Sequence, residues 1–586
     1  MSESYCKMRT SKHENGETKV QETLISFEKF TFQYRSQSEA TLQELTLGIQ
    51  KGERVIIVGA SGCGKSTLAH CLNGLIPFSY PGESKGNLFV CGLETKESSI
   101  FELSQSVGTV LQDTDGQFIG MTVLEDIAFS LENDCIPKSE MQERTMQEAI
   151  KVNLVEKLGA SPHELSGGQK QRVSMAGVLV NKIPLLLFDE PLANLDPAAG
   201  KSAMELIDEI QRKTDTTVII IEHRLEDALH MGADRIILME DGKVIADTSP
   251  STLFAGNRLH DAGIREPLYI TAMKYAGIRL TPDMKLQRVQ ELNLTAEQKE
   301  QIQAWFYGQA KPYKKEESAS LLSVEELSFG YTQQKLNLSK IAFTVRKGEM
   351  ISIVGKNGAG KSTLAKLLCG FEKSDAGNIY LKGKEISEDT IRERAEFIGY
   401  VMQNPNQMIS KPMLYDEVAL GLRVKKISEE VIKERVHLVL KKCGLYEFRK
   451  WPISALSYGQ KKRVTIASIL VEEPEILILD EPTAGQDFRH YTEFMEFLKE
   501  LNQNGITVLM ITHDMHLMLE YTERTFVFAD GELIADTTPA RLFSDEKLIQ
   551  RASLKETSLF WLAKETNLPA EEFIDKFIAY DRQVRS

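Results

Sequence analysis

The sequence predicts an α/β protein made of two similar halves, each built around a mainly parallel β-sheet. Short apolar runs at 184–188 and 217–221 alternate with stretches of helical spacing, which is typical of buried parallel strands. The same order of runs recurs about 290 residues later, at 476–479 and 507–511, so the second half repeats the first. Active groups of open α/β sheets lie at the carboxyl ends of such strands, so the residues that follow these runs are the first candidates for a site.

Composition and charge limit the classes of function. The chain has 586 residues, of which 42% are hydrophobic and 26% charged, and this length predicts two or more domains. The net charge of −14 gives a nucleic-acid partner no general electrostatic support, and we expect none. The seven cysteines include no C-x-x-C pair, which argues against a zinc or iron–sulfur site.

We expect no segment of this chain to cross a membrane. No run reaches the roughly 18–20 apolar residues that span a bilayer. The stretch from Met1 to Cys6 is polar, whereas a signal peptide has an apolar core. These observations predict a cytoplasmic protein whose association with a membrane depends on a partner.

A glycine-rich loop follows a strand-like run in each half. The first reads G-x-x-x-x-G-K-S from Gly59 to Ser66, and the pattern recurs from Gly355 to Ser362. In this context the motif predicts a phosphate-binding loop, whose backbone N–H groups and helix N-terminus surround the phosphates. Its lysine would reach the β- and γ-phosphates, and its serine would hold Mg²⁺. The residues predicted to bind nucleotide are Gly59, Ser61, Gly62, Gly64, Lys65, Ser66 and Thr67, with Gly355, Asn357, Gly358, Gly360, Lys361, Ser362 and Thr363 in the second half.

Two carboxylates follow a buried strand in each half. Asp189 would hold Mg²⁺, directly or through water, and Glu190 could polarise a water for attack on the γ-phosphate. Asp480 and Glu481 repeat this pair in the second half. A lone D-E-P would be a turn after a strand. Because a phosphate-binding loop precedes it in the same half, we favour the catalytic interpretation.

A histidine and a glutamine recur at matched positions in both halves. His223 and His513 each follow the next strand. A single histidine at a strand end is usually structural, but the matched pair suggests sensors of the γ-phosphate. Gln112 and Gln403 each follow a further apolar run, where a glutamine can touch Mg²⁺ or the attacking water.

A serine-containing turn opens a helix in each half and predicts another anion site. Its residues are Ser166, Gly167, Gly168 and Gln169 in the first half and Ser457, Tyr458, Gly459 and Gln460 in the second. The ordered set of phosphate loop, glutamine, L-S-G-G-Q, Asp-Glu and histidine resembles the ABC-type ATPase family, twice over nearly the whole chain. The resemblance implies two P-loop domains that hydrolyse ATP with Mg²⁺, each with a mainly parallel core, an α-helical signature subdomain and an antiparallel β subdomain.

The resemblance also implies that the two halves share their sites. ABC domains pair head to tail around two ATP molecules, so the signature turn of each half would complete the site of the other. One site would combine Lys65, Gln112, Glu190 and His223 with Ser457 and Gly459, and the other Lys361, Gln403, Glu481 and His513 with Ser166, Gly167 and Gly168.

Two further features match the family, and one position departs from its pattern. Tyr34 and Tyr331 match the aromatic residue that stacks on adenine, although each could be an ordinary strand aromatic. Ala193 to Asp196 and Ala484 to Asp487 match the loop that links the sites. Tyr458 replaces the first glycine of the signature, where a ring could crowd the phosphate. Because every catalytic-type group is present in both halves, we expect two competent but unequal sites.

The repeat predicts the order of domains. They are a disordered N-terminus at 1–22, a first ABC domain at 23–255, a helical appendage and linker at 256–320, a second ABC domain at 321–545 and a helical appendage at 546–586. Within the first appendage, helical spacing predicts a surface helix over 285–305, followed by a linker near 308–320.

Three classes of ABC protein compete as the function. They are the energising subunit of an importer, a soluble twin-cassette factor acting on ribosomes, and a DNA-repair ATPase. Ribosome-acting relatives typically carry a long charged linker or an N-terminal cysteine cluster, and repair types carry zinc cysteines and large insertions. This sequence has none of these features.

Within importers, the runs 116–118, 122–129 and 222–228 resemble energy-coupling-factor ATPases. That family drives vitamin and metal uptake with an integral membrane coupling subunit and a separate substrate-capture subunit. Fused twin cassettes of this kind look similar to the ATPase of hydroxymethylpyrimidine/thiamine uptake systems. The resemblance places the chain at the cytoplasmic face of the membrane.

The coupling subunit would dock on the segments that follow Gln112 and Gln403. Apolar residues there, Phe118, Ile119, Met408 and Ile409, would receive its helices. The alternative is that these four residues belong to the internal core.

Overall fold

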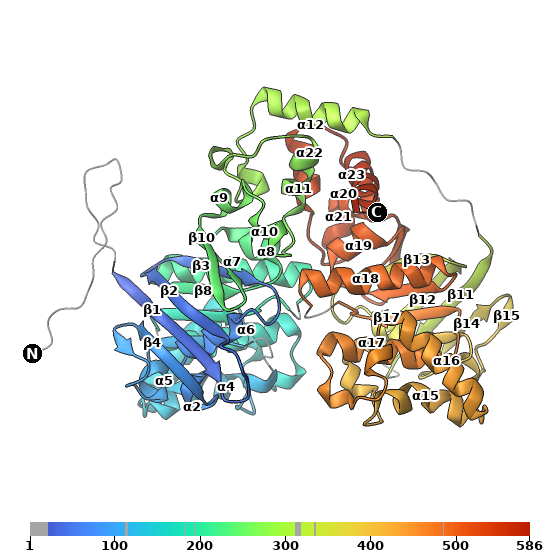
Figure 1. Ribbon diagram of the computed structural model, residues 1–586, viewed down its shortest axis with the longest axis horizontal. Helices are drawn as coiled ribbons and strands as arrows, with labels where there is room; N and C mark the ends of the chain where they lie inside the picture. Colours follow the sequence, from blue (N-terminus) through green and yellow to red (C-terminus); the bar gives the residue numbers. More distant parts are fainter. Residues whose placement is uncertain are drawn as a thin grey trace, which may run out of the picture. The chain divides into compact units, whose positions relative to one another are not determined.

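The computed structural model describes residues 22–111, 115–181, 183–193, 195–310, 318–332, 336–483 and 486–585. The contacts divide the chain into two units, Met1–Ile302 and Gln303–Ser586. Each unit contains one antiparallel sheet and one mainly parallel sheet, together with helices (Figure 1). The α/β fold of two repeated domains predicted from the sequence is therefore confirmed.

The first unit is built on a six-stranded sheet of order β10-β9-β3-β8-β7-β6. Its strands are β3 (Arg54–Gly59), β6 (Val107–Val110), β7 (Leu185–Asp189), β8 (Thr217–Ile221), β9 (Arg235–Glu240) and β10 (Lys243–Thr248). All neighbours are parallel except β9 and β10. Every residue of β3 is buried, as expected for a central strand covered on both faces.

A four-stranded antiparallel sheet of order β2-β1-β4-β5 lies in the same unit. Its strands are β1 (Thr23–Tyr34), β2 (Leu42–Gln50), β4 (Gly82–Val90) and β5 (Leu93–Glu94). Inward residues of β1 and β2 share one hydrophobic core with β3 and with the helix that follows β3. That shared core fixes the phosphate-binding loop between the two sheets.

The second unit repeats both sheets, in the orders β16-β17-β18-β13-β19-β20 and β12-β11-β14-β15. The first comprises β13 (Met350–Gly355), β16 (Ile398–Val401), β17 (Ile476–Asp480), β18 (Thr507–Ile511), β19 (Arg524–Ala529) and β20 (Glu532–Thr537). The second comprises β11 (Ser320–Phe329), β12 (Leu338–Arg346), β14 (Ala376–Leu381) and β15 (Lys384–Glu385).

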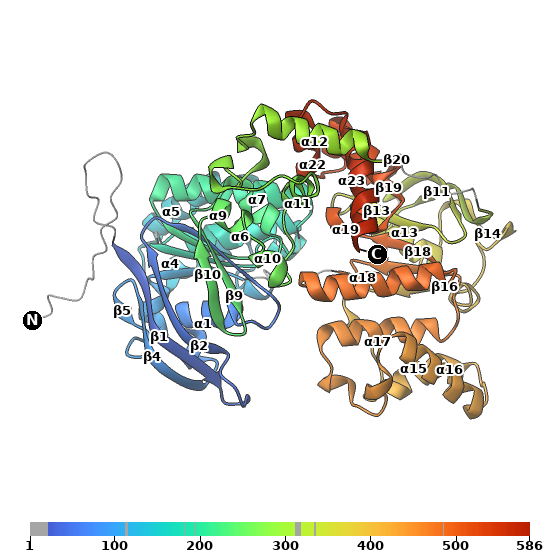
Figure 2. The ribbon, with the colours of Figure 1, turned by 45° about the horizontal axis from the view of Figure 1, so that its top comes forward.

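The longer helices also recur in the two units. In the first unit these helices follow the phosphate loop, form the helical subdomain and cover the sheet. They are α1 (Lys65–Leu72), α4 (Val123–Asn133), α5 (Lys138–Lys151), α6 (Gly167–Leu179) and α7 (Pro197–Thr214). Their partners are α13 (Lys361–Cys369), α15 (Leu414–Val424), α16 (Glu429–Lys442), α17 (Tyr458–Leu470) and α18 (Phe488–Gln503). Both views place α15, α16 and α17 on one side of α18 (Figures 1 and 2).

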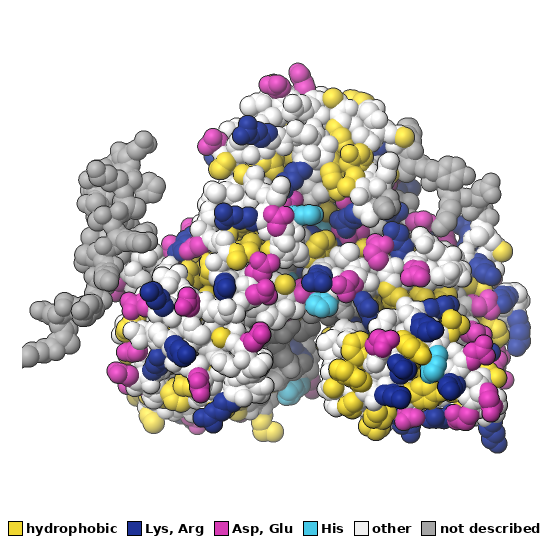
Figure 3. All heavy atoms as spheres, in the orientation of Figure 1, with side chains coloured by type: hydrophobic (Ala, Val, Ile, Leu, Met, Phe, Trp, Pro, Cys, Tyr) yellow, Lys and Arg dark blue, Asp and Glu magenta, His cyan; other side chains and the backbone are white. Residues whose placement is uncertain are grey.

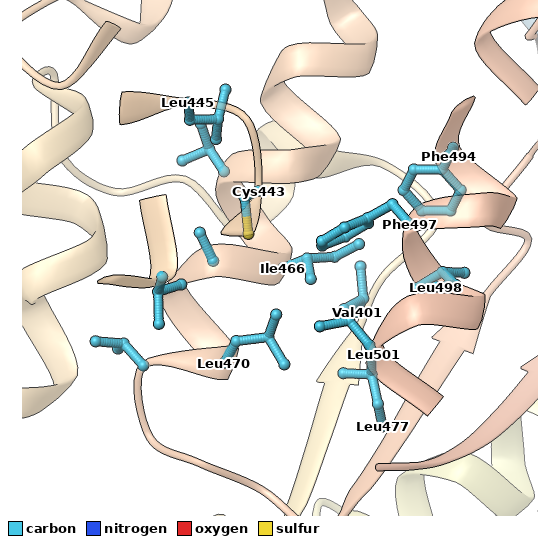
Figure 4. Close-up of a cluster of buried hydrophobic side chains, with 14 of the residues drawn as sticks. Val401, Cys443, Leu445, Ile466, Leu470, Leu477, Phe494, Phe497, Leu498 and Leu501 are labelled. Carbon is cyan, nitrogen blue, oxygen red and sulfur yellow. The ribbon is translucent and has the colours of Figure 1, made fainter. Parts of the chain in front are cut away.

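In the second unit one hydrophobic core joins the helical subdomain to the sheet. Ile466 and Leu470 of α17 pack with Phe494 and Leu498 of α18 in a cluster that also contains Leu477 of β17 (Figure 4). All five are almost fully buried. Because this packing is close, we expect α17 and β17 to keep their relative position.

Short helices complete each unit. They are α2 (Leu75–Phe78), α3 (Ile100–Ser104), α8 (Leu225–Ala228), α9 (Pro250–Phe254), α10 (Arg258–Asp261) and α11 (Leu268–Tyr275), and in the second unit α14 (Ile391–Arg394), α19 (Met515–Tyr521), α20 (Pro539–Ser544), α21 (Glu546–Arg551) and α22 (Ser558–Glu565). The C-terminal helix is α23 (Ala570–Arg585). No helix in the described part of the chain has the length and apolar character needed to cross a membrane.

The boundary between the units falls inside α12 (Ala296–Gly308). Its C-terminal part belongs to the second unit, where Lys576 donates a hydrogen bond of 3.0 Å to the carbonyl oxygen of Phe306 and lies 4.0 Å from the centre of that ring. Trp305 packs edge-on against Phe573. The predicted surface helix over 285–305 thus begins only at Ala296, and near its end Phe306 is buried while Tyr307 is exposed.

Candidate functional site

The phosphate-binding loop joins β3 to α1 in the first unit. Gly64 ends the loop with φ of 104°, and an added Cβ there would lie 2.9 Å from the carbonyl oxygen of Thr41. Lys65 is 5% exposed, and its ammonium donates hydrogen bonds to the carbonyl oxygens of Gly59 (2.8 Å) and Ala60 (2.9 Å). The loop carbonyls therefore hold the ammonium at the N-terminus of α1, where an anion is favoured.

The second loop repeats this geometry. Gly360 has φ of 97°, and Lys361 donates to the carbonyl oxygens of Gly355 (2.6 Å) and Lys356 (2.9 Å). The remaining predicted loop residues surround this point: Ser61, Gly62, Ser66, Asn357, Gly358 and Ser362 are exposed, Thr67 is buried and Thr363 is half-buried. Both loops thus present serine and backbone to solvent above a buried lysine.

Asp189 at the end of β7 lies beside this loop. Its carboxylate is hydrogen-bonded to Ser66, while its Oδ1 atom is buried without a hydrogen-bond partner among the described residues. Burial, and then the charge of Glu190, raise the pKa of Asp189 to about 6 despite Lys65 and Ser66. A hydroxyl and an incompletely bonded carboxylate are the oxygen ligands that Mg²⁺ prefers, so these residues fit the predicted ion.

Asp480 at the end of β17 has a different neighbour. The hydroxyl of Tyr400 donates to Asp480 Oδ2 over 3.0 Å. Burial, and then the charge and hydrogen bond of Asp480, raise the pKa of Tyr400, which keeps its hydroxyl a donor. This bond could not be predicted from the sequence, because Tyr400 stands in an apolar run before Gln403.

Glu190 and Glu481 follow these aspartates in unusual backbone conformations. Their φ angles are 49° and 46°, in the left-handed region, and each amide donates 2.9 Å to the next strand, at the carbonyl oxygens of Ile221 and Ile511. For a residue other than glycine, such a conformation costs on the order of 1–3 kcal/mol and is common at functional sites. It fixes the direction of each carboxylate.

The predicted histidines lie against these glutamates. His223 Nε2 is 2.9 Å from Glu190 Oε1, and His513 Nε2 is 3.4 Å from Glu481 Oε1. Burial raises the pKa of Glu190, but the hydrogen bond and charge of His223 outweigh it, so the net pKa is lowered. The pKa of Glu481 is raised by burial, against the opposing charge of Lys361.

Glu222 is a site residue that the sequence reasoning missed. It is 2% exposed and accepts hydrogen bonds from the backbone amides of Leu192 (2.9 Å), His223 (3.0 Å) and Arg224 (3.2 Å). It thereby fixes the backbone on both sides of the glutamate–histidine pair. Thr512 stands at this position in the second unit. The sequence feature that could have indicated Glu222 is its position, as a charged residue at the end of an apolar strand.

Each signature turn begins a helix within its own unit. The hydroxyl of Ser166 accepts from the Gln169 amide, while the Gln169 side chain accepts from the Ser166 amide. Ser457 and Gln460 form the same reciprocal cap on α17. An added Cβ at Gly168 would lie 3.4 Å from Ala199, and one at Gly459 would meet nothing within 4 Å, so the turns are open; Gly167 is half-buried.

The aromatic residues predicted to meet adenine differ in surroundings. Tyr34 is half-buried, and its hydroxyl is 3.0 Å from that of Thr67 next to the loop. Tyr331 is 50% exposed, with Lys366 5.9 Å from its ring centre. Stacking on a base stays a prediction for both, and the more exposed ring of Tyr331 has more surface to offer.

The remaining predicted positions lie just after β16, in the two predicted linking loops, or outside the described residues. Gln112, Asn194, Ala484 and Gly485 lie outside the described residues. Gln403 is exposed just after β16. Asp196 and Asp487, from the predicted linking loops, cap α7 and α18 by accepting from the amides of Ala199 and His490.

Comparisons with known proteins agree with this geometry. The sequence model of the family described as "ABC transporter" matches residues 42–193 and 338–484, and one described as "ATP-binding cassette cobalt transporter" matches 256–329. A "Putative ABC transporter ATP-binding protein" of Clostridium perfringens is 54% identical over 564 residues, covering 96% of this chain and 99% of its own. A protein of the same description from Enterococcus faecalis is 57% identical over 568 residues, covering 97% and 100%.

A solved structure of cbiO1 from Clostridium perfringens is 37% identical and covers 39% of this chain and 93% of its own, with a TM-score of 0.37. The family model matches in both halves, and the relatives match nearly end to end. The resemblance found in the sequence motifs is therefore confirmed, and the chain belongs to the ABC transporter ATP-binding proteins, as a twin-cassette ATPase coupled to transport.

Proposed function

We propose that this ATPase energises an energy-coupling-factor importer of a vitamin or a metal ion. The observation that carries the catalytic part is the glutamate–histidine pair next to a buried loop lysine, which is present in both units. The family match at 256–329, described as a cobalt transporter, supports a metal as cargo. The resemblance to hydroxymethylpyrimidine/thiamine systems supports a vitamin instead.

The side chains divide the work on ATP. Lys65 and Lys361 would leave the loop carbonyls for the β- and γ-phosphates, and the signature turns would contact the γ-phosphate from the other unit. Ser66 and Asp189, with Ser362 and Asp480, would hold Mg²⁺, which neutralises phosphate charge when it is bound. Gln112 and Gln403 would contact this ion or the attacking water.

Glu190 and Glu481 would orient and polarise the attacking water, and the histidines would contact the γ-phosphate. The left-handed backbone at each glutamate supports this role, because such conformations are common at functional sites. Head-to-tail pairing of the two units around two ATP molecules would open and close with hydrolysis, and this movement would drive the partner.

The coupling subunit would bind the segment before α4 and its counterpart in the second unit. Ile119 is 64% exposed and Met121 84% exposed, so both are available to an apolar partner. Phe118, Met408 and Ile409 are instead partly buried against the cores of their own units, as the alternative interpretation held. Hydrophobic side chains also gather between Lys and Arg on the helical subdomain of the second unit (Figure 3).

The decisive experiment is affinity purification of the tagged chain from detergent-solubilised native membranes, followed by mass spectrometry. Recovery of one integral coupling protein and a small multi-span capture protein is the expected result. Ile119→Asp should lose both proteins, while Ile150→Asp on α5, an isoleucine of similar exposure (58%), should keep them. Recovery of ribosomes, or of no membrane protein, would replace the importer with the soluble twin-cassette factor.

The purified complex then distinguishes the cargo. Labelled Co²⁺ and labelled hydroxymethylpyrimidine are offered in turn to vesicles that contain the complex and internal ATP. Accumulation of one and not the other assigns the substrate class, and accumulation of neither would overturn the proposed import of these two cargoes.

A further inference from the structure

The two signature helices differ at one buried position. Gln171 of α6 donates a hydrogen bond of 2.6 Å to the carbonyl oxygen of Pro191, which follows the catalytic-type Glu190. In the second unit this position is Lys462 of α17, and its ammonium donates 2.8 Å to the carbonyl oxygen of Pro482. Both side chains are almost fully buried, at 3% and 2% exposed. The turn after Glu190 is thus held by the neutral amide of Gln171, and the equivalent turn after Glu481 by the cation of Lys462.

Lys462 reaches further than the glutamine does. Its ammonium also lies 3.4 Å from the carbonyl oxygen of Glu481, where it acts as a donor. Burial lowers the pKa of Lys462 to about 8, and the charge of Glu481 partly opposes this shift. Burying a cation costs free energy unless nearby groups stabilise the charge. Lys462 lies next to the turn of Glu481 and Pro482, so we expect a further group to contact its ammonium.

Tyr458 provides a further contact to the Lys462 ammonium. It is the residue that replaces the first signature glycine, and its ring centre lies 5.3 Å from the Lys462 ammonium, within the range of a cation–π interaction. Its hydroxyl donates 3.4 Å to the carbonyl oxygen of Gln403. The first unit has Gly167 at this position and therefore has no such ring.

The four contacts of Lys462 and Tyr458 are joined through one helix face. Tyr458 and Lys462 are four residues apart on α17, so they lie on one face of the helix. Further along, Ile466 and Leu470 anchor α17 in the core shared with α18 and β17 (Figure 4). A displacement at the first turn of α17 is therefore transmitted to the carbonyl oxygens of Glu481 and Pro482, because the helix and the strand are packed together.

We infer that Tyr458 and Lys462 are positioning residues that connect the signature turn of the second unit to its own Glu481 and Gln403. Neither side chain touches the reacting atoms; they set the direction of the Glu481 backbone. All four contacts lie within one unit. Contact of the signature turn with ATP rests on the proposed head-to-tail pairing, whereas the effect of Lys462 on Glu481 does not.

In that arrangement the connection runs between the two ATP sites. The signature turn at Ser457 would belong to the site of Lys65 and Glu190, while Glu481 acts in the other site. Binding at one site would then adjust the catalytic group of the other through Tyr458 and Lys462. Among the described residues of the first unit, the equivalent position supplies the neutral Gln171 contact, so the effect on catalysis would be stronger at Glu481 than at Glu190.

The test measures kcat and KM for ATP with the full chain in its membrane complex. Lys462→Met removes both the charge and the donor, and Lys462→Gln reproduces the first unit and keeps one hydrogen bond. Lys461→Met is the matched control, because it removes a lysine from the adjacent, half-buried position of the same helix. We expect Lys462→Met to lower kcat by about two- to tenfold with KM within about twofold, and Lys462→Gln to lower it less.

A second comparison tests the connection itself. Tyr458→Leu is combined with Lys462→Met, and the double variant should lose no more kcat than Lys462→Met alone, because both changes break one path. Effects that multiply, or an unchanged kcat in Lys462→Met, would overturn the inference. An unchanged thermal midpoint in Lys462→Gln shows that a loss of kcat in that variant is not a loss of folded protein.

A separate variant tests the proposed head-to-tail pairing of the two units. If the signature turn contacts the ATP of the other unit, Ser457→Arg should remove the turnover of the site that contains Glu190 and leave that of the site that contains Glu481. Full turnover in that variant would reject the pairing. The comparison of Lys462→Met with Lys461→Met would still decide whether Lys462 positions Glu481.

Discussion

His223 Nε2 lies 2.9 Å from Glu190 Oε1, which is 0.5 Å closer than the corresponding pair in the second unit (3.4 Å minus 2.9 Å, His513 with Glu481). The shorter contact lowers the pKa of Glu190 against the effect of burial, whereas burial prevails at Glu481 and raises its pKa. The two sites therefore have the same residue types but different readiness to accept a proton.

Single glutamine variants should reveal this difference. Glu190→Gln and Glu481→Gln are each expected to keep part of the ATP turnover, because the other site has a full set of groups. The turnover left in Glu190→Gln depends on Glu481, which must lose its proton, so its rate should rise from about pH 6 to pH 9. The turnover left in Glu481→Gln should change little over the same range, since Glu190 is already ionised. Complete loss from one variant with none from the other would contradict two competent sites.

Asp189→Asn should stabilise the nucleotide-free chain. The folded pKa of Asp189, about 6, lies above its ordinary value of 3.8, so its contribution is favourable below pH 3.8 and is lost as the pH rises through 6. At neutral pH the asparagine avoids this buried charge, and the free energy of unfolding of the first unit should rise by roughly 1–3 kcal/mol. Thermal unfolding checks the gain, and the variant should lose Mg²⁺-dependent hydrolysis at its own site. A lower midpoint would show that Asp189 has a stabilising partner.

Removal of the adenine-side rings should weaken nucleotide binding. Tyr34→Ala and Tyr331→Ala are each expected to raise the Kd for ATP at one site by about three- to tenfold, since a stacked aromatic pair contributes roughly 0.5–1.5 kcal/mol. Phenylalanine at either position keeps the ring and should restore affinity, although Tyr34→Phe also loses the bond to Thr67. Equilibrium titration with a fluorescent ATP analogue measures both sites. Unchanged affinity in Tyr331→Ala would leave this residue as an ordinary surface aromatic.

Phe306→Ala should destabilise the second unit. The side chain is 1% exposed and lies under Lys576, so truncation leaves a cavity and an exposed cation, at a cost of about 3–5 kcal/mol. Tyr307→Ala is the control, because that neighbour is 72% exposed and should change stability by less than about 0.5 kcal/mol. Thermal unfolding distinguishes them, and equal midpoints would mean that α12 does not contribute to the core of this unit.

The strands that carry the site were predictable because they are short, apolar and bounded by turns. The predicted runs 217–221 and 507–511 coincide with β8 and β18, and 476–479 falls one residue short of the end of β17. Periodicity reports burial, and burial is what the central strands share. The positions of the glutamates and histidines were predictable because each follows such a strand at matched places in both halves, whereas their catalytic roles stay predictions.

The side chains behind the site were not predictable in the same way. Glu222 and Lys462 act through backbone groups that are near in space but 30 and 20 residues away in sequence, at Leu192 and Pro482. No local pattern records such contacts. The position of Tyr458 was noticed in the sequence, but its ring lies over Lys462 rather than standing alone in the turn.

The placement of α12 has a consequence for how this chain arose and how it can be divided. A second cassette cut at the predicted linker near 308–320 would leave Trp305 and Phe306 on the wrong fragment, and the bond from Gln303 to the carbonyl oxygen of Thr566 would be lost with them. The sequence repeat therefore predicts a boundary near 308–320, whereas the contacts place the boundary between the two units at Gln303. A gene split into two open reading frames would need to begin the second before Gln303, so that the end of α12 stays with the unit on which it packs.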